Sequence, residues 1–170
     1  MSPVLTNSAS TITLSPSDNY TLSSVDDTNR PFRYEAGGRI AGDTNAGSHS
    51  IFLRFALPAR APGATIASAT LDLHAESNAN SSYPLSVYVI PNSWEVSDMA
   101  DGNRPVASGQ PLLSFNVGAG SDAHLDLTSA VDAAFQIDGV ITLLITNAEY
   151  TYNAQDFSVA KALNISIATP

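Results

Sequence analysis

The sequence predicts an all-β protein, a single antiparallel β-sandwich of the jelly-roll type that carries one short helix near residues 129–135. The first observation is an alternation of apolar and polar residues, which is typical of strands with one face in a core and one in water. It is marked within residues 51–90 by Ile66, Leu71, Leu73, Val87 and Val89. The second observation is that short extended segments recur along the chain with turn residues between them.

The chain is predicted to form one domain. Residues 1–10 are an N-terminal arm or edge strand, and residues 11–170 form the sandwich, because no internal repeat or linker divides them. Met1–Asn7 has neither a basic segment nor an apolar run, so it is not a signal peptide. From this we expect a chain that begins at its own Met1 and reaches its place of action without secretion, or one whose signal has been trimmed.

The first 40 residues are predicted to hold short strands separated by polar turns. Thr11–Leu14 alternates, and the turn residues Pro16–Asn19 separate it from the extended segment Tyr20–Leu22. Gly37-Gly38 is a hairpin signal. The two strands of that predicted hairpin are Phe32–Glu35 and Arg39–Ile40.

The rest of the chain supplies the central strands and the helix. Val140–Ile145 is the most apolar run and is predicted to be a central strand, and Thr128 is predicted to cap a helix over Ser129–Phe135, with Asp132 in its first turn. The other predicted strands are Ile51–Leu57, Thr65–Glu76, Leu85–Ile90, Leu112–Val117, Ala123–Leu127, Gln155–Val159 and Leu163–Ile167.

Composition limits the partners. The chain has 170 residues, a hydrophobic fraction of 44% and a net charge of −9 with only seven Lys and Arg, so it is globular but would be repelled by nucleic acid and by an anionic membrane. An anionic polysaccharide would be repelled too, unless the few arginines cluster. Cysteine is absent, which excludes disulfides, thiolate metal sites and a Cys nucleophile.

Several motifs follow one another in an order that resembles a known family. They are "TITLSPSDNYTL", "IFLRFALPARAPGATIASATLDLHA", "LSVYVIPNSWEVSDMADGNRP", "LDLTSAVDAAF", "GVITLLITN" and "FSVAKALNISIA". This order is similar to that of DNRLRE-type β-sandwich modules, which resemble carbohydrate-binding modules. One departure is that Asp101-Gly102-Asn103 stands where the family has a second loop tryptophan. The resemblance implies a non-catalytic jelly roll, usually met as one module of a large secreted protein or polysaccharide-degrading enzyme.

Tyrosines are the candidate carbohydrate-binding residues, because a flat ring can stack on the apolar face of a sugar. Tyr150 and Tyr152 stand two residues apart, so a strand would place both on one face. Tyr34 and Tyr88 are candidates for the same surface, together with Tyr20 and Tyr83. The alternative is that these rings lie half-buried at the rim of a sheet with their hydroxyls in water.

A structural calcium ion is the one cofactor considered. Asp98, Asp101 and Asn103 offer oxygen ligands beside a glycine, as calcium loops do. The alternating spacing and the closing Glu of such loops are absent, so an acidic turn without an ion is the alternative. His49, His74 and His124 are interpreted as three unrelated surface histidines, with His74 directed to water.

Two further side chains receive structural interpretations. Arg54 is flanked by Leu53 and Phe55, so it faces the other side of its strand, where we expect an ion pair with Asp72 or Glu76. Trp94 follows the strand Leu85–Ile90 and is expected to pack under the long loop after it.

The sequence contains no Gly-x-Ser-x-Gly motif. Paired carboxylates for glycoside hydrolysis stay an open alternative if Glu35, Glu76, Glu95 and Glu149 meet in space, but their spacing does not require it. The resemblance implies a non-catalytic module, so we expect no enzyme. The first hypothesis is a decoration or surface protein of a virion, with protein partners in a capsid or tail and docking by strand addition, also to itself. The alternative is a carbohydrate-binding module of a secreted enzyme or adhesin that binds a surface glycan, or an extracellular filament subunit. Both place the protein on a virion surface or outside the cell, with no nucleic acid and no membrane as partner.

Overall fold

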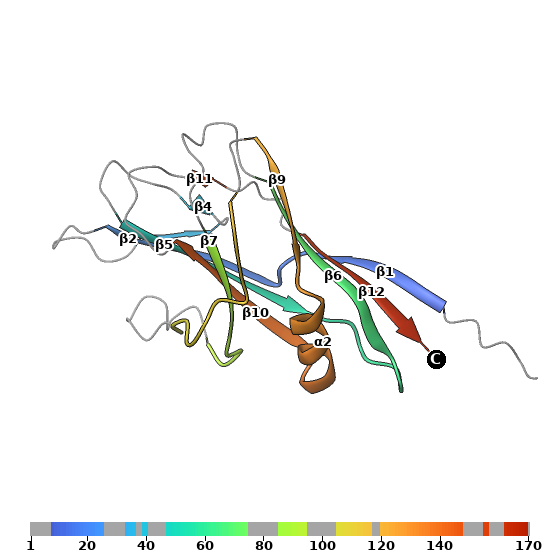
Figure 1. Ribbon diagram of the computed structural model, residues 1–170. Coiled ribbons are helices and arrows are strands. Elements are labelled where there is room, and N and C mark those ends of the chain that lie inside the picture. The colour runs from blue at the N-terminus through green and yellow to red at the C-terminus, as the bar shows by residue number, and fades with distance from the viewer. Residues whose placement is uncertain are drawn as a thin grey trace, which may run out of the picture.

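A computed structural model describes residues 8–25, 33–36, 39–40, 47–74, 85–94, 105–116, 120–147, 155–156 and 162–169. The described residues form two main antiparallel sheets, a small two-stranded sheet and one helix, so the predicted all-β sandwich with a single short helix is confirmed (Figure 1). Figure 1 shows the helix α2 lying close to β10 and to β6, which belong to different sheets. No helix within these ranges is long and apolar enough to cross a membrane.

The strand order is that of a jelly roll. The first sheet contains, in order across it, β1 (Ser8–Leu14), β12 (Ala162–Thr169), β6 (Thr65–His74) and β9 (Asp122–Asp126). The second contains β3 (Arg33–Ala36), β2 (Asp18–Val25), β5 (Gly47–Ala56), β10 (Val140–Asn147), β7 (Leu85–Ile90) and β8 (Leu113–Phe115). The chain repeatedly changes sheet, and the first described strand pairs with the last over seven residue pairs.

The main core lies between the two sheets and is closed at one end by α2 (Thr128–Ile137). Each sheet contributes every second residue, as the alternation predicts. The helix adds Val131 and Phe135, both buried. Large members from the strands include Ile51, Leu53, Phe55, Leu71, Leu73, Leu85, Ile141, Leu143, Leu163 and Ile165.

The strand β10 is buried on both faces, which explains why its sequence is apolar without alternation. It lies between β5 and β7 in the six-stranded sheet, as predicted for a central strand. Its inner face joins the main core. On the outer face Leu144 belongs to a second, smaller apolar cluster with Phe52, Ile90 and Trp94.

A bulge explains how β6 buries residues of opposite parity. Ile66 and Leu71 are five positions apart, so unbroken alternation would place them on opposite faces. Ser166 of β12 pairs with Ser68, whereas Ile167 pairs with Ile66, so β6 has one extra residue at this point. The bulge resets the alternation, and Ile66 and Leu71 both reach the core.

The helix begins one residue earlier than predicted and ends two residues later, and Thr128 is not its cap. The capping position is Leu127, whose side chain makes no capping bond, and no acidic residue lies in the first turn. The Thr128 hydroxyl instead accepts a hydrogen bond from the Ala69 N–H (3.0 Å) and donates one to Asp126 Oδ1 (2.6 Å). A residue expected to act locally therefore joins the helix to β6.

The predicted hairpin around Gly37-Gly38 is replaced by longer-range pairing. Two strands form where they were expected, but β3 pairs with β2. The strand β4 (Arg39–Ile40) pairs with β11 (Gln155–Asp156) in a separate two-stranded sheet. The proposed division of the chain at residue 10 stays a prediction, and β1 spans that position.

Candidate functional site

A row of hydroxyl side chains crosses the outer face of the six-stranded sheet, the face turned away from the main core. Ser50, Thr146, Ser86 and Ser114 are successive register partners on β5, β10, β7 and β8. Ser50 Oγ donates to Thr146 Oγ1 (3.2 Å), and the hydroxyls of Ser86 and Ser114 are 3.0 Å apart. These four residues are called the hydroxyl row. They lie opposite in parity to the core residues beside them, which places all four on this face.

Tyr88 lies beside the hydroxyl row, two positions along β7 from Ser86. Its register partner is Leu144, which also pairs with Phe52 on its other side. The Tyr88 ring packs against the apolar cluster of Phe52 and Leu144 and remains partly exposed. Tyr88 therefore combines the two properties that the sequence alternatives set against each other: it is half-buried, and it forms part of an accessible face.

For Tyr34, one of the other predicted tyrosines, the structure describes only the backbone. Tyr34 lies in β3 opposite Leu22, and Leu22 in turn pairs with Ser50, so its backbone continues the line of the hydroxyl row. Four strand spacings separate β3 from β7, about 19 Å of sheet, so Tyr34 and Tyr88 are not adjacent. Tyr150 and Tyr152 follow β10 in the sequence and lie outside the described residues. The proposed calcium ligands Asp98, Asp101 and Asn103 also lie outside them, and that site stays a prediction.

The chemistry of this outer face suits a polyol. Each Ser hydroxyl can donate one hydrogen bond and accept two, so the bond that each of Ser50, Ser86 and Ser114 makes within the row leaves capacity for a further partner. An aromatic ring beside such groups can stack on the apolar face of a sugar. Sequence reasoning considered the tyrosines and missed the hydroxyl row. Its signal was a Ser or Thr at a non-core position in or next to four predicted strands. Ser86 and Ser114 lie within their strands, and Ser50 and Thr146 lie just beyond the predicted limits of theirs.

Arg54 and Trp94 occupy the same outer face, one row beyond Phe52. The predicted ion pair of Arg54 with Asp72 or Glu76 is wrong for Asp72, because β5 and β6 belong to different sheets. Glu76 lies outside the described residues. Arg54 Nη1 lies 3.2 Å from Asp18 Oδ2 on β2, its register partner. Its guanidinium covers Trp94, which is buried, so this end of the face is closed rather than open to a ligand.

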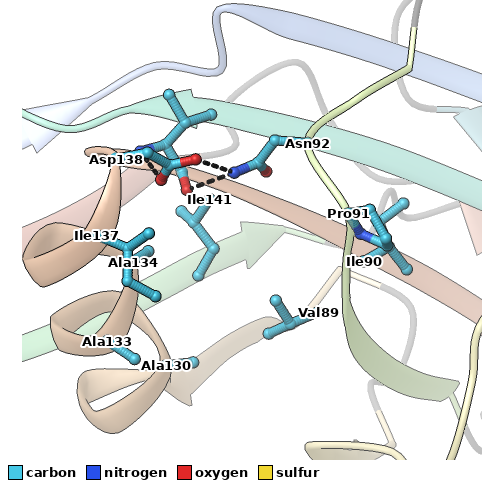
Figure 2. Close-up of a pocket in the computed structure, with 11 residues that line it drawn as sticks. Val89, Ile90, Pro91, Asn92, Ala130, Ala133, Ala134, Ile137, Asp138 and Ile141 are labelled. Atoms are coloured by element: carbon cyan, nitrogen blue, oxygen red, sulfur yellow. Dashed lines mark hydrogen bonds between the residues drawn. The ribbon is translucent and has the colours of Figure 1, made fainter.

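A cleft of about 300 Å³ lies between α2 and the strands β7 and β10 (Figure 2). Its walls are aliphatic, with Ala130, Ala133, Ala134 and Ile137 on the helix facing Val89 and Ile141. Val89 was predicted to alternate into the core with Val87, yet it is 49% exposed, because it opens into this cleft.

The polar side chains at one end of the cleft, Asn92 and Asp138, already form hydrogen bonds within the protein. Asn92 Nδ2 donates to Asp138 Oδ2 and to the Val140 carbonyl, both at 3.0 Å, while its Oδ1 accepts from Thr142 at 2.9 Å. The side-chain bond from Asn92, with the Val140 N–H, lowers the pKa of Asp138. A cleft with aliphatic walls and occupied polar groups offers a sugar little to bind.

A network of polar pairs crosses the outer face of the four-stranded sheet. His124 Nδ1 lies 2.6 Å from Asp72 Oδ1, and His74 Nδ1 lies 2.6 Å from Asp122 Oδ1. Asn164 donates to Asp72 Oδ2. The interpretation as unrelated is therefore wrong for His74 and His124, because they lie on adjacent strands and each pairs with the aspartate directly opposite it. The side chain of His49 lies outside the described ones. No group of three metal-ligating side chains forms among the described residues.

The outer face with the hydroxyl row is therefore the best candidate site within the described chain. It has accessible hydroxyls beside a ring, whereas the cleft is aliphatic and the His–Asp network is internally paired. The model of carbohydrate-binding module family 96 matches residues 10–165. That range includes all of the strands β2 to β11, most of β1 and the first half of β12. The resemblance to carbohydrate-binding modules is thereby confirmed. No curated protein matches the chain.

Proposed function

Because the chain belongs to carbohydrate-binding module family 96, we propose that it is a non-catalytic module that binds a glycan on the outer face of its six-stranded sheet. The observation that carries the proposal is the family match over residues 10–165. The proposed ligand-contacting residues are Tyr88 and the hydroxyl row. Further candidates are Tyr34, on the edge strand β3, and Tyr150 and Tyr152, which lie outside the described residues.

The geometry supports this choice of face in two ways. The hydroxyl row follows the register of four neighbouring strands, so its spacing is fixed by backbone hydrogen bonds rather than by loops. Such preorganisation reduces the entropy that a polar site loses when it binds. The strands also lie about 4.8 Å apart, so the row presents a hydroxyl at regular steps to an extended chain.

A carbohydrate-binding module, which was the alternative interpretation of the sequence, is thus favoured over a decoration protein of a virion. A capsid or tail decoration role has no supporting observation in the described residues or in the comparisons. A module of this family fits a protein that acts outside the cell, on a glycan of a cell surface or of the surroundings.

The test is binding of the full chain to a panel of soluble polysaccharides, both neutral and uronate-rich, by isothermal titration calorimetry. We expect binding to at least one of them, and a loss of about tenfold in affinity for Tyr88→Ala, equal to about 1.4 kcal/mol. Tyr88→Phe keeps the ring and should bind almost as the unmodified chain does. Ser114→Arg, at an exposed position, should block the row without disturbing the core.

The matched control is Ser166→Ala, which removes a hydroxyl from the other sheet and should leave affinity unchanged. Circular dichroism melting of each variant separates loss of binding from loss of folding. No binding to any polysaccharide would overturn the function. Binding that survives both Tyr88→Ala and Ser114→Arg but disappears in Tyr150→Ala or Tyr152→Ala would keep the function and move the site.

A further inference from the structure

The two main sheets have four edge strands, and three of them carry features that prevent pairing with another chain. Within the described residues, β8 has only three residues, and β3 has four, including Arg33 and Glu35. The strand β9 carries Asp122, His124 and Asp126, all exposed. Short length and charge are the usual means by which proteins keep sheet edges from associating.

The fourth edge strand, β1, has none of these features. It is seven residues long and contains neither a charged residue nor a proline. It pairs with β12 in unbroken register, without a bulge that would twist its edge away. Figure 1 shows β1 beside β12, and the strand order places no described strand on its other side.

The charge distribution of the four-stranded sheet also singles out this edge. Neither β1 nor β12 contains an ionisable side chain, whereas β6 and β9 carry Asp72, His74, Asp122, His124 and Asp126. The whole chain has a net charge of −9, so two copies repel each other over most orientations. The uncharged half of this sheet is a surface at which two copies can approach.

The main core is incompletely covered at the same edge. Ile12 and Leu14 pack against the core but stay partly exposed, while their partners Ile165 and Leu163 on β12 are fully buried. An additional strand on the far side of β1 would cover Ile12 and Leu14 and pair the outward backbone groups of β1.

From these observations we propose that β1 is a self-association surface, where the β1 strands of two copies pair antiparallel about a twofold axis. The two four-stranded sheets then become one continuous eight-stranded sheet. The strand suits a second copy because an axis at its midpoint, Thr11, pairs Ser10 with Ile12 and Ser8 with Leu14. This register pairs residues of the same parity and brings no charge opposite another.

The self-association does not depend on the proposed glycan binding. The hydroxyl row lies on the other sheet, so pairing through β1 leaves it uncovered. A dimer would present two such faces, which raises the avidity for a repetitive polymer.

The first test is sedimentation velocity of the full chain over concentrations from micromolar to near millimolar. We expect the sedimentation coefficient to rise with concentration for the unmodified chain. Thr11→Lys places two like charges at the twofold axis and should stay monomeric throughout. The matched control is Ser166→Lys, because Ser166 is the direct register partner of Thr11 on the interior strand β12 and should still associate.

The second test uses the absence of cysteine from the chain. Thr11→Cys should form an intermolecular disulfide under mild oxidation much faster than Ser166→Cys, because only position 11 meets its own copy. A chain that is monomeric at every concentration would overturn the proposal, as would equal rates for the two cysteine variants. Concentration-independent hydrogen-exchange protection of the outward β1 amides would also overturn it, since another part of the same chain would then fill the edge.

Discussion

The guanidinium carbon of Arg54 lies 4.0 Å from the centre of the Trp94 ring, and the two side chains close one end of the outer face of the six-stranded sheet. Arg54 Nη2 also donates to the carbonyls of Asn92 (3.1 Å) and Trp94 (2.5 Å). The guanidinium of Arg54 thus fixes the segment after β7, which contains Asn92 and Trp94, against β5.

We expect Arg54→Lys to lower the free energy of unfolding by about 2 kcal/mol, because an ammonium cannot reproduce the stacked, forked geometry. Urea unfolding followed by fluorescence measures this directly, since Trp94 is the single tryptophan in the chain. Arg60→Lys, at an exposed arginine, is the control and should change stability by less than about 0.5 kcal/mol. Equal effects of the two substitutions would show that the Arg54 contacts add nothing.

The Thr128 hydroxyl is expected to contribute more to the free energy of unfolding than its partial exposure suggests. Thr128→Val leaves the N–H of the buried Ala69 without its acceptor, so we expect a loss of about 1–3 kcal/mol in the free energy of unfolding. Thr128→Ser keeps the hydroxyl and should lose much less. Ser129→Ala, at the next and exposed position of α2, is the control. The loss should be measured by chemical denaturation, and a Thr128→Val protein as stable as the control would contradict this role.

His124 makes the stability depend on pH near neutrality. Its hydrogen bond to Asp72, and then the charge of Asp72, raise the pKa of His124 above the usual 6.5. A raised folded-state pKa means that this contribution is fully present below pH 6.5 and is lost as the pH rises through the folded-state value. We expect the urea midpoint to fall across that interval, with a smaller fall in His124→Gln.

An NMR titration of the imidazole gives the pKa itself, and Asp72→Asn should return it towards its ordinary value. The hydrogen bonds of Asp126 and Asp138 act in a different range. Bonds from Thr128 lower the pKa of Asp126, and the bond from Asn92 lowers that of Asp138. Their contributions are present above pH 3.8 and are lost only as the pH falls through the lowered values, so they do not obscure the His124 effect.

Gly139 lies two residues after the last residue of α2 and has a positive φ of 71°, and its N–H donates to the Ala134 carbonyl at 3.0 Å. A Cβ at this position would meet no atom within 4 Å, so the cost of a side chain there is conformational rather than steric. We expect Gly139→Ala to lower the free energy of unfolding by about 1–2 kcal/mol and Gly139→Asn to lower it less, since Asn tolerates the left-handed region. Thermal and urea unfolding of the two variants measure the difference. If they are equally stable, the left-handed backbone is not the cause.

Local sequence pattern was sufficient for the sandwich and for the position of most strands. The run Val140–Ile145 predicted a central strand because a strand covered on both faces has no need to alternate. The pattern could not supply the pairing. Arg54 has Leu and Phe on both sides, which fixes its face but not its neighbour, and the neighbour proved to be β2 rather than β6.

The bulge in β6 and the role of Thr128 could not be predicted from the sequence, for the same reason. Both depend on which residue of a distant strand lies opposite: Ser166 and Ile167 for the bulge, and Ala69 for Thr128. The candidate site was anticipated in part. Tyr88 belongs to it, but the hydroxyl row comes into being only when four strands align in register, and each of its residues alone is an ordinary surface serine or threonine.

Ser8 and Thr169 face each other across the β1–β12 ladder, so the two strands carry the described ends of the domain out at the same place. A mechanical load applied through those two residues would act across the ladder rather than along it. The hydrogen bonds of the ladder would then bear the load one pair at a time and break in sequence, beginning at Ser8. A domain tethered through these ends would yield at β1 under low force, while β5, β10 and β7, with the proposed ligand face, remained folded.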